Sequence, residues 1–156
     1  MSQDEIQTAV NAEELEEFLI RYVPLARAAG VRVSSYDGVT LSVSAPLDKN
    51  INDKGTAFGG SLYNLCVIAG WGMTSIQCEA LGLKGDIVVA KGEIEYLRPL
   101  RSELKASVSV PSAELMAHFV ESYERRGRAS LKHDVWVAGD DDQPAAHFIG
   151  KYAIVK

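Results

Sequence analysis

One uncharged stretch constrains the fold of this chain more than any other part of it. Residues 61–78 contain no charged side chain and no proline. They contain the large apolar residues Leu62, Leu65, Val67, Ile68, Trp71, Met73 and Ile76. Because the run is too long for a single strand, it predicts a helix that is buried on most sides. Polar residues and the glycines Gly70 and Gly72 interrupt the run, so it does not predict a membrane span.

A polar loop and three glycines lead into this predicted helix. Residues 50–54 read Asn-Ile-Asn-Asp-Lys, and Gly55, Gly59 and Gly60 follow. A glycine pair at a helix start can present bare backbone N–H groups to an anion or to a developing oxyanion. Spacing alone leaves two interpretations of Asn52 and Asp53. They are ordinary loop and helix-entry residues, or they hold a water at the helix mouth for hydrolysis without a protein nucleophile.

The segments before this loop predict a helix and a hairpin. Asn11 followed by Glu14 is typical of a capped helix start, and Gly30 is a plausible helix end. One apolar helical face is made by Leu15, Phe18, Leu19, Tyr22 and Val23. Asp37-Gly38 separates residues 31–36 from residues 39–45 and predicts a two-residue hairpin turn with positive φ at both positions.

The rest of the chain predicts strands at residues 86–97, 103–110, 115–124, 129–138 and 145–155. Short turns between successive strands indicate an antiparallel sheet. The order of elements therefore predicts an α+β fold, in which one curved antiparallel sheet wraps a long central helix. Lys91, Glu93 and Glu95 alternate along the first of these strands. Their face either lies in water or brings an acid to the site of a neighbouring subunit.

Length and charge restrict the class of protein. The 156 residues suit one domain, which we expect over residues 13–156, after a disordered segment at residues 1–12. The net charge of −5 argues against a nucleic-acid binder. The polar, acidic start does not resemble a signal peptide, so we expect a cytoplasmic protein. Cys66 and Cys78 are too far apart along the predicted helix to bridge, and we expect free thiols.

Several kinds of site find no support in the sequence. No spacing of ligands predicts a metal site, and there is no phosphate loop, dinucleotide fingerprint or nucleophile elbow. Three histidines lie inside predicted strands, where a structural, surface or catalytic role stays open: His118, His133 and His147. The basic cluster at residues 125–128 is either a solvated hairpin tip or a patch that meets a phosphorylated ligand.

Two motifs resemble a known family. Residues 52–60, Asn-Asp-Lys-Gly-Thr-Ala-Phe-Gly-Gly, resemble the Asn-x-x-Gly-x-x-Phe-Gly-Gly motif of hotdog-fold acyl-CoA thioesterases. Residues 92–99, Gly-Glu-Ile-Glu-Tyr-Leu-Arg-Pro, are similar to the strand that follows the central helix in that family. With the Gly-Trp-Gly of residues 70–72, the resemblance is closest to the YiiD C-terminal thioesterase-like domains, and it covers the chain from about Glu13 to its end.

The resemblance implies a hotdog fold and a thioester substrate. Such domains form homodimers whose sheets join, and the dimers often pair into tetramers. The substrate would be an acyl-CoA or acyl-carrier-protein thioester in a tunnel at the dimer interface. Coenzyme A would enter only as part of the substrate, with no separate cofactor or metal. Neither a nucleic-acid nor a membrane partner is expected.

One position departs from the family pattern. Many hotdog thioesterases carry an acid on the central helix seven residues after the second glycine, and that position is Val67 here. The expected catalytic residues are therefore Asn52, Asp53, Gly59, Gly60 and Asn64. The expected substrate-binding residues are Phe58, Ser61, Tyr63, Val67 and Trp71. For Tyr63 and Trp71, an ordinary role as core or interface aromatics is the alternative.

Three functions follow from these residues. The leading hypothesis is hydrolysis of an acyl thioester by an activated water, with Asp53 or Asn52 orienting the water and Asn64 or Ser61 assisting. Because Val67 cannot take a proton, the alternative is a non-catalytic module that binds acyl thioesters or CoA. Hydration or dehydration of an acyl thioester is a third possibility, but that chemistry usually needs a histidine, and the loop before Gly59 has none.

Overall fold

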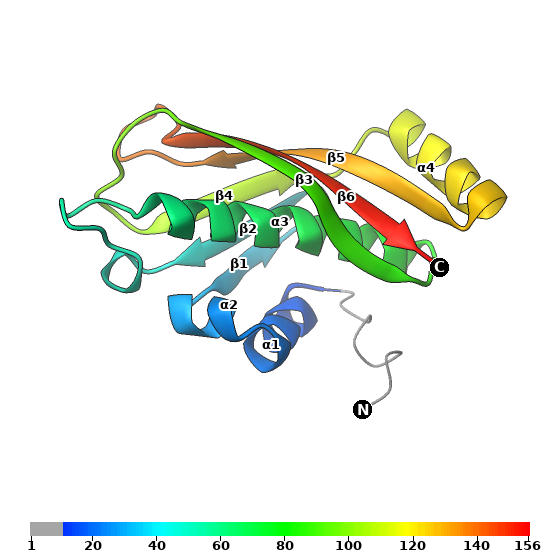
Figure 1. Cartoon of the computed structure of the whole chain (residues 1–156), viewed down its shortest axis with the longest axis horizontal. Helices are drawn as coiled ribbons and strands as arrows, with labels where there is room; N and C mark the ends of the chain where they lie inside the picture. Colours follow the sequence, from blue (N-terminus) through cyan, green and yellow to red (C-terminus); the bar gives the residue numbers. More distant parts are fainter. Residues whose placement is uncertain (1–10) are drawn as a thin grey trace.

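The computed structural model describes residues 11–156 as one antiparallel sheet that curves around a long helix (Figure 1). Disorder is predicted for residues 1–12, and residues 1–10 of that segment lie outside the described residues. Asn11 and Ala12 form the start of the first helix. Within residues 11–156, no helix combines the length and the apolar character that crossing a membrane requires.

Six strands form the sheet in the order β1-β2-β4-β5-β6-β3, and every neighbouring pair is antiparallel. In chain order they are β1 (Arg32–Tyr36), β2 (Thr40–Ala45), β3 (Asp86–Tyr96), β4 (Leu104–Ser109), β5 (Arg128–Val137) and β6 (Ala146–Val155). The six corresponding sequence predictions are confirmed. The long strand β3 forms one edge of the sheet, and within the described residues β6 is its strand partner.

The predicted central helix is confirmed as α3 (Gly59–Ala80). Twelve of its 22 residues are buried, which explains the uncharged run in the sequence. Tyr152 of β6 crosses the helix closely at Gly70, where a Cβ atom would collide with the tyrosine ring. The Tyr152 hydroxyl donates to the backbone oxygen of Val67 at 2.8 Å. Sheet and helix thus form one core on the concave face of the sheet.

The N-terminal helices are α1 (Ala12–Tyr22) and α2 (Pro24–Ala29). As predicted, the Asn11 side chain caps α1 by accepting from the N–H of Glu14 at 3.0 Å. The predicted helix end at Gly30 is confirmed, with φ of 71°. Figure 1 shows both helices beside β1 at one side of α3, and α1 packs on β1.

The Asp37-Gly38 hairpin is confirmed, but its turn differs from the prediction. Gly38 has φ of 93°, and no non-glycine residue among the described ones has a positive φ. The Asp37 carboxylate instead accepts from the N–H groups of Val39 and Thr40, at 2.8 and 2.7 Å. These bonds hold the pKa of Asp37 below its usual value. The predicted positive φ at Asp37 is wrong because its side chain, rather than its backbone, forms the turn.

The strand predicted at residues 115–124 is wrong, because these residues belong to α4 (Ala113–Arg126). The Ser112 hydroxyl caps the helix by accepting from the Leu115 N–H at 3.2 Å, and Gly127 ends it with φ of 70°. The buried residues Phe119, Ser122 and Tyr123 recur at helical spacing. The arginines of residues 125–128 therefore surround a helix end, and the hairpin tip predicted for them is wrong.

Helix α4 lies beside the sheet where two strands separate (Figure 1). β4 pairs with β5 only between Val135 and Val137, and α4 packs along the remainder of β5. Phe119 and Tyr123 form a second apolar cluster there with Leu131 of β5 and Cys78 of α3. The predicted free thiols are confirmed: Cys66 and Cys78 are unbridged and buried, and burial raises the pKa of each to about 12.

Candidate active site

The loop before α3 is built around Asn52. Its side-chain oxygen accepts from the N–H groups of Lys54 and Thr56, at 2.9 and 3.0 Å. Its side-chain nitrogen donates to the Thr56 hydroxyl at 2.8 Å. Both polar ends of the amide are therefore occupied within the loop. Gly55, with φ of 80°, supplies the left-handed residue that lets the chain turn back.

Asn50 anchors the same loop to the protein body, a role that sequence analysis missed. The side chain is 3% exposed, and its nitrogen donates to the backbone oxygens of Ala29 and Pro46, at 2.9 and 2.7 Å. Its backbone oxygen accepts from the N–H of Phe58 at 2.7 Å. Phe58, the residue just before α3, is thus held by the backbone oxygen of Asn50, the residue that starts the loop.

The N-terminus of α3 has no side-chain cap. Phe58 is the capping residue, and its backbone oxygen accepts from the N–H groups of Ser61 and Leu62, at 3.0 and 3.1 Å. Within residues 11–156, the N–H groups of Gly59 and Gly60 have no hydrogen-bond acceptor. A Cβ on Gly60 would lie 2.7 Å from the Phe58 ring, so only glycine fits there without a shift. The helix therefore begins with two open donors, as the glycine pair predicts.

The two motifs of the sequence meet at this helix start. The Tyr96 hydroxyl donates to the backbone oxygen of Gly59 at 2.8 Å, and the Ala57 N–H donates to the backbone oxygen of Leu100 at 2.8 Å. Between them lies an open pocket of about 350 Å³, lined by Thr56, Ala57, Gly59, Leu62, Tyr96, Leu97, Arg98, Pro99 and Leu100. Tyr96 is 54% exposed, and desolvation raises its pKa. Tyr96 is not among the site residues predicted from the sequence, although the motif of residues 92–99 contains it.

The polar candidates of the sequence lie in different surroundings. The Asp53 side chain is 82% exposed and forms an ion pair with Lys54 at 3.1 Å. Asn64 is half-buried one turn into α3, and its side chain has no hydrogen-bond partner within the described residues. No hydrogen bond of the described part of the chain joins Asn52, Asp53 and Asn64 to one another. The catalytic assignment of these residues stays a prediction.

A half-exposed stripe runs along the otherwise buried helix α3. Asn64, Val67 and Trp71 are its half-buried members, and they follow Gly60 at steps of four, three and four residues. This spacing places them on one helical face. The ring of Trp71 stacks on Phe18 of α1 with centroids 5.2 Å apart, and its N–H donates to the backbone oxygen of Ile87 at 3.2 Å. Val67 lies in the middle of this stripe.

The remaining predicted binding residues flank the same helix start. Tyr63 is half-buried and packs edge-on against Phe148, with ring centroids 5.3 Å apart. Its hydroxyl lies over Gly92 of β3, where any Cβ would collide with it. Ser61 is half-buried, and Phe58 is 56% exposed. Tyr63 therefore packs against the core, whereas Phe58 offers its ring to the solvent, and the substrate-binding assignment of both residues stays a prediction.

The comparison with protein families decides what kind of chain this is. A family model described as "Putative thioesterase (yiiD_Cterm)" matches residues 12–156, nearly the whole chain. The chain belongs to the YiiD_C family. The resemblance of the two sequence motifs is thereby confirmed.

Solved structures agree with this assignment. A protein of unknown function from Chlorobaculum tepidum is 34% identical to the YiiD_C chain, with 94% of this chain and 98% of the other covered and a TM-score of 0.89. A structure from Shewanella oneidensis described as a "putative thioesterase" is 33% identical, with 99% and 100% covered and a TM-score of 0.82. A thioesterase from Haemophilus influenzae shares the fold at 12% identity, with 96% and 94% covered and a TM-score of 0.71. The predicted hotdog fold is confirmed.

The three histidines of the YiiD_C chain lie away from the start of α3. The described residues contain no group of three or more potential metal ligands. His133 is buried in β5, and its ring nitrogen Nε2 lies 2.9 Å from the hydroxyl of Thr74 in α3. His147 of β6 lies 2.8 Å from the Asp134 carboxylate on the outer side of the sheet. His118 lies on α4, so the strand predicted for it is wrong.

Proposed function

We propose that this chain hydrolyses an acyl-CoA or acyl-carrier-protein thioester at the N-terminus of α3. The observation that carries the proposal is the pair of open N–H donors at Gly59 and Gly60 beside the pocket at Tyr96. Donors aimed at a carbonyl oxygen stabilise the negative charge that develops on it during nucleophilic attack. Membership of a thioesterase family supports a thioester as the substrate.

The reaction needs a water that attacks the thioester carbon. The carbonyl oxygen accepts from the open N–H groups and gains negative charge as the water oxygen adds. The C–S bond then breaks, the carbonyl reforms, and the thiolate leaves and takes up a proton. An acid and a thiol are the products. These steps require a group that receives the proton of the water.

We assign that proton acceptor to Asp53. The Asn52 amide is occupied by three hydrogen bonds within the loop, so its role here is to hold the loop in shape. The exposed carboxylate of Asp53 is the acidic side chain nearest in sequence to the open donors. The unpartnered amide of Asn64 lies one turn into the helix and orients the water or the thioester. Val67 then contributes an apolar contact to the acyl chain.

We also propose that the site is completed by a second copy of the chain. β3 is an edge strand, and one of its sides has no strand partner in the described residues. Val88, Val89 and Tyr96 on this strand are each at least 45% exposed. An open strand edge with exposed apolar residues favours pairing with another edge. The second chain would cover the half-exposed stripe of α3 and enclose the acyl group there.

The alternative is a module that binds acyl thioesters without hydrolysing them. The observation that favours it is Val67, because α3 carries no carboxylate between Gly59 and Cys78. In that case the open donors would only hold the carbonyl group. The half-exposed stripe of α3 would still select the acyl chain. Turnover decides between these two functions.

Thiol release from a panel of acyl-CoAs and acyl-carrier proteins tests the proposal. We expect steady turnover on one class of acyl chain, and a loss of about 100-fold or more in kcat for Asp53→Asn, as is usual for removing a general base. Asp48→Asn, an exposed acid just before the loop, is the matched control and should retain full activity. Absence of turnover on every substrate, together with thermal stabilisation by CoA, would establish the binding module instead.

A further inference from the structure

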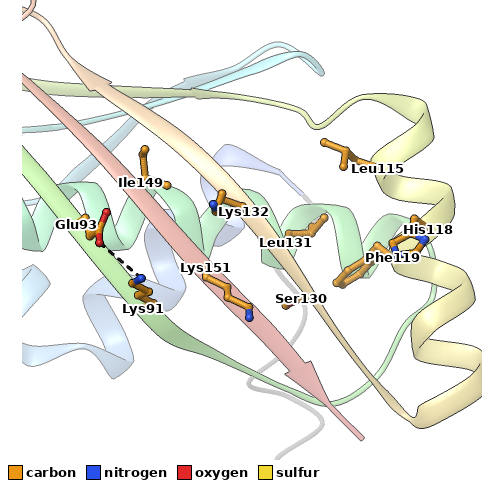
Figure 2. A pocket seen from close by; sticks show the side chains of 10 residues that line it. All are labelled: Lys91, Glu93, Leu115, His118, Phe119, Ser130, Leu131, Lys132, Ile149 and Lys151. Carbon is orange, nitrogen blue, oxygen red and sulfur yellow. Dashed lines mark ion pairs between the residues drawn. The ribbon is translucent and has the colours of Figure 1, made fainter.

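Three lysines form a row across the outer face of the sheet, the face that points away from α3. Lys91 of β3 pairs in register with Lys151 of β6, and Lys151 pairs with Lys132 of β5. All three are exposed, and Lys132 and Lys151 alternate with buried neighbours along their strands. Adjacent strands lie about 4.8 Å apart, so the three Cα atoms fall within roughly 10 Å. Figure 2 shows the three side chains on neighbouring ribbons.

This row is not neutralised by the chain itself. Lys91 lies 3.6 Å from Glu93, a pair in which both side chains are at least 70% exposed and which is therefore weak. Within residues 11–156, Lys132 and Lys151 form no ion pair within 4 Å. Like charges directly opposite on neighbouring strands destabilise a sheet. In a chain of net charge −5, an in-register row of three cations is a feature that its fold does not need.

The row lies in a hollow rather than on a flat face. A cavity of about 470 Å³ extends from β3 across β6 and β5 to α4, and Glu93 is the only acidic residue among those that line it. In Figure 2 the lysines lie on one side, and Leu115 and His118 of α4 face them from the other. Leu115 is 55% exposed, although it is a large apolar residue. With the half-buried Ile149 it gives the hollow an apolar part.

We propose that this hollow, which we call the lysine groove, binds a phosphorylated organic molecule. Its phosphate oxygens accept from the ammonium groups of Lys91, Lys132 and Lys151, because a phosphate carries the negative charge that the row lacks. Its organic part lies against Leu115 and Ile149. A nucleoside phosphate has both parts in one molecule. The proposal does not depend on the thioesterase activity, since it concerns another face of the sheet.

Calorimetric titration of the full chain with ADP tests the proposal. We expect saturable binding of one ADP per chain in low salt, competition by inorganic pyrophosphate, and no binding of adenosine. Lys132→Gln and Lys151→Gln should each weaken ADP binding by about tenfold, which corresponds to the loss of one charge-assisted contact. Lys151→Arg keeps the charge and should restore most of the affinity.

The matched control is Lys105→Gln, which removes an exposed lysine on β4 that does not line the groove. We expect it to change the Kd for ADP by less than about twofold, since screened charges at a distance contribute little. Equal weakening by Lys105→Gln and Lys151→Gln would overturn the site, because binding would then follow net charge alone. Absence of saturable binding of both ADP and pyrophosphate would overturn it as well.

The organic half of the ligand has its own test. Leu115→Ala should weaken ADP binding several-fold and leave pyrophosphate binding unchanged. If ADP and pyrophosphate bind equally and Leu115→Ala affects neither, the apolar half of the proposal is wrong. If Lys132→Gln with Lys151→Gln changes the oligomeric state in light scattering, with no phosphate present, the row is instead an interface between chains, and the ligand proposal is wrong.

The KM of wild type and of Lys151→Gln for an acyl-CoA identifies the source of the phosphate groups. If an acyl-CoA is turned over and Lys151→Gln raises KM without a change in kcat, the groove holds the phosphates of the substrate. If ADP binds to the groove and KM is unchanged, the groove holds a separate phosphorylated ligand. Both results support the groove. ADP binding is measured without turnover, so failure of the thioesterase proposal does not affect this test.

Discussion

The hydroxyl of Tyr96 donates to the backbone oxygen of Gly59, at 2.8 Å, and joins the edge strand β3 to the first residue of α3. A Cβ on Gly59 would lie 3.2 Å from the Tyr96 ring, so the two residues also pack closely. This bond ties the first turn of α3, where the open N–H groups lie, to β3. We therefore expect a side chain from beyond the helix to help position the proposed donors.

Tyr96→Phe removes this bond and keeps the ring. We expect a loss of about 1 kcal/mol in the free energy of unfolding, the usual contribution of one hydrogen bond, and a fall in kcat on whichever thioester is turned over. Urea unfolding and thiol release measure the two effects. Tyr36→Phe is the control, because the Tyr36 hydroxyl receives only a long contact of 3.4 Å from Gln77. Unchanged kcat in Tyr96→Phe would show that the bond does not position the donors.

His133 should make the fold sensitive to acid. Burial lowers its pKa from 6.5 to about 4, while the neighbouring Asp134 acts weakly in the opposite direction. The surrounding groups are the Thr74 hydroxyl and the Tyr152 ring. Because the unfolded chain binds the proton more readily, stability is complete above about pH 6.5 and is lost as the pH falls toward 4. The lost stability is on the order of 3 kcal/mol.

Urea unfolding of wild type and His133→Gln between pH 8 and pH 4 measures this dependence. We expect the free energy of unfolding to fall more steeply below pH 6.5 in the wild type than in the variant. This difference in slope does not depend on how much stability the substitution removes at pH 8. His147→Gln is the control on the outer face, where the ring already pairs with Asp134. Parallel curves for wild type and His133→Gln would contradict the buried neutral imidazole.

The caps of α4 should contribute to stability. Ser112→Ala removes the bond to the Leu115 N–H, and we expect a cost of about 1 kcal/mol. Gly127→Ala places a Cβ at φ of 70°, where a left-handed residue costs about 1 kcal/mol or more. Denaturant unfolding measures both variants. Ser109→Ala, at the exposed end of β4, is the control, and an equal loss there would mean that capping is not the cause.

Gly70→Ala should destabilise the protein although alanine favours helices. The gain in helix propensity is about 1 kcal/mol, but the new Cβ would collide with the ring of Tyr152, a residue with no exposed surface. Overpacking of this kind costs about 1–3 kcal/mol, so the net change is a loss. Thermal unfolding checks the sign. Gln77→Ala, on the half-buried side of α3, should change stability far less.

The clearest difference between the sequence prediction and the structure is at residues 115–124, which were predicted as a strand and lie in α4. Ser112 and Gly127, which cap α4, are both helix signals and could have been recognised. The buried residues Phe119, Ser122 and Tyr123 also recur at helical spacing, which favours a helix over a strand. For the turn at Asp37, the sequence identified the hairpin but not its conformation, because a side-chain bond replaced the expected backbone geometry.

Elements with local signals follow from the amino-acid sequence alone. The uncharged run, the glycine pair and the Asp37-Gly38 turn specify α3, its open start and the first hairpin, since each acts within a few residues of the chain. The order of strands within the sheet and the contacts between elements follow from the tertiary structure. Tyr96 reaches Gly59 from 37 positions away, and the three lysines form a row through the register of β3, β6 and β5. Register depends on pairing between distant segments, so no short window of sequence contains it.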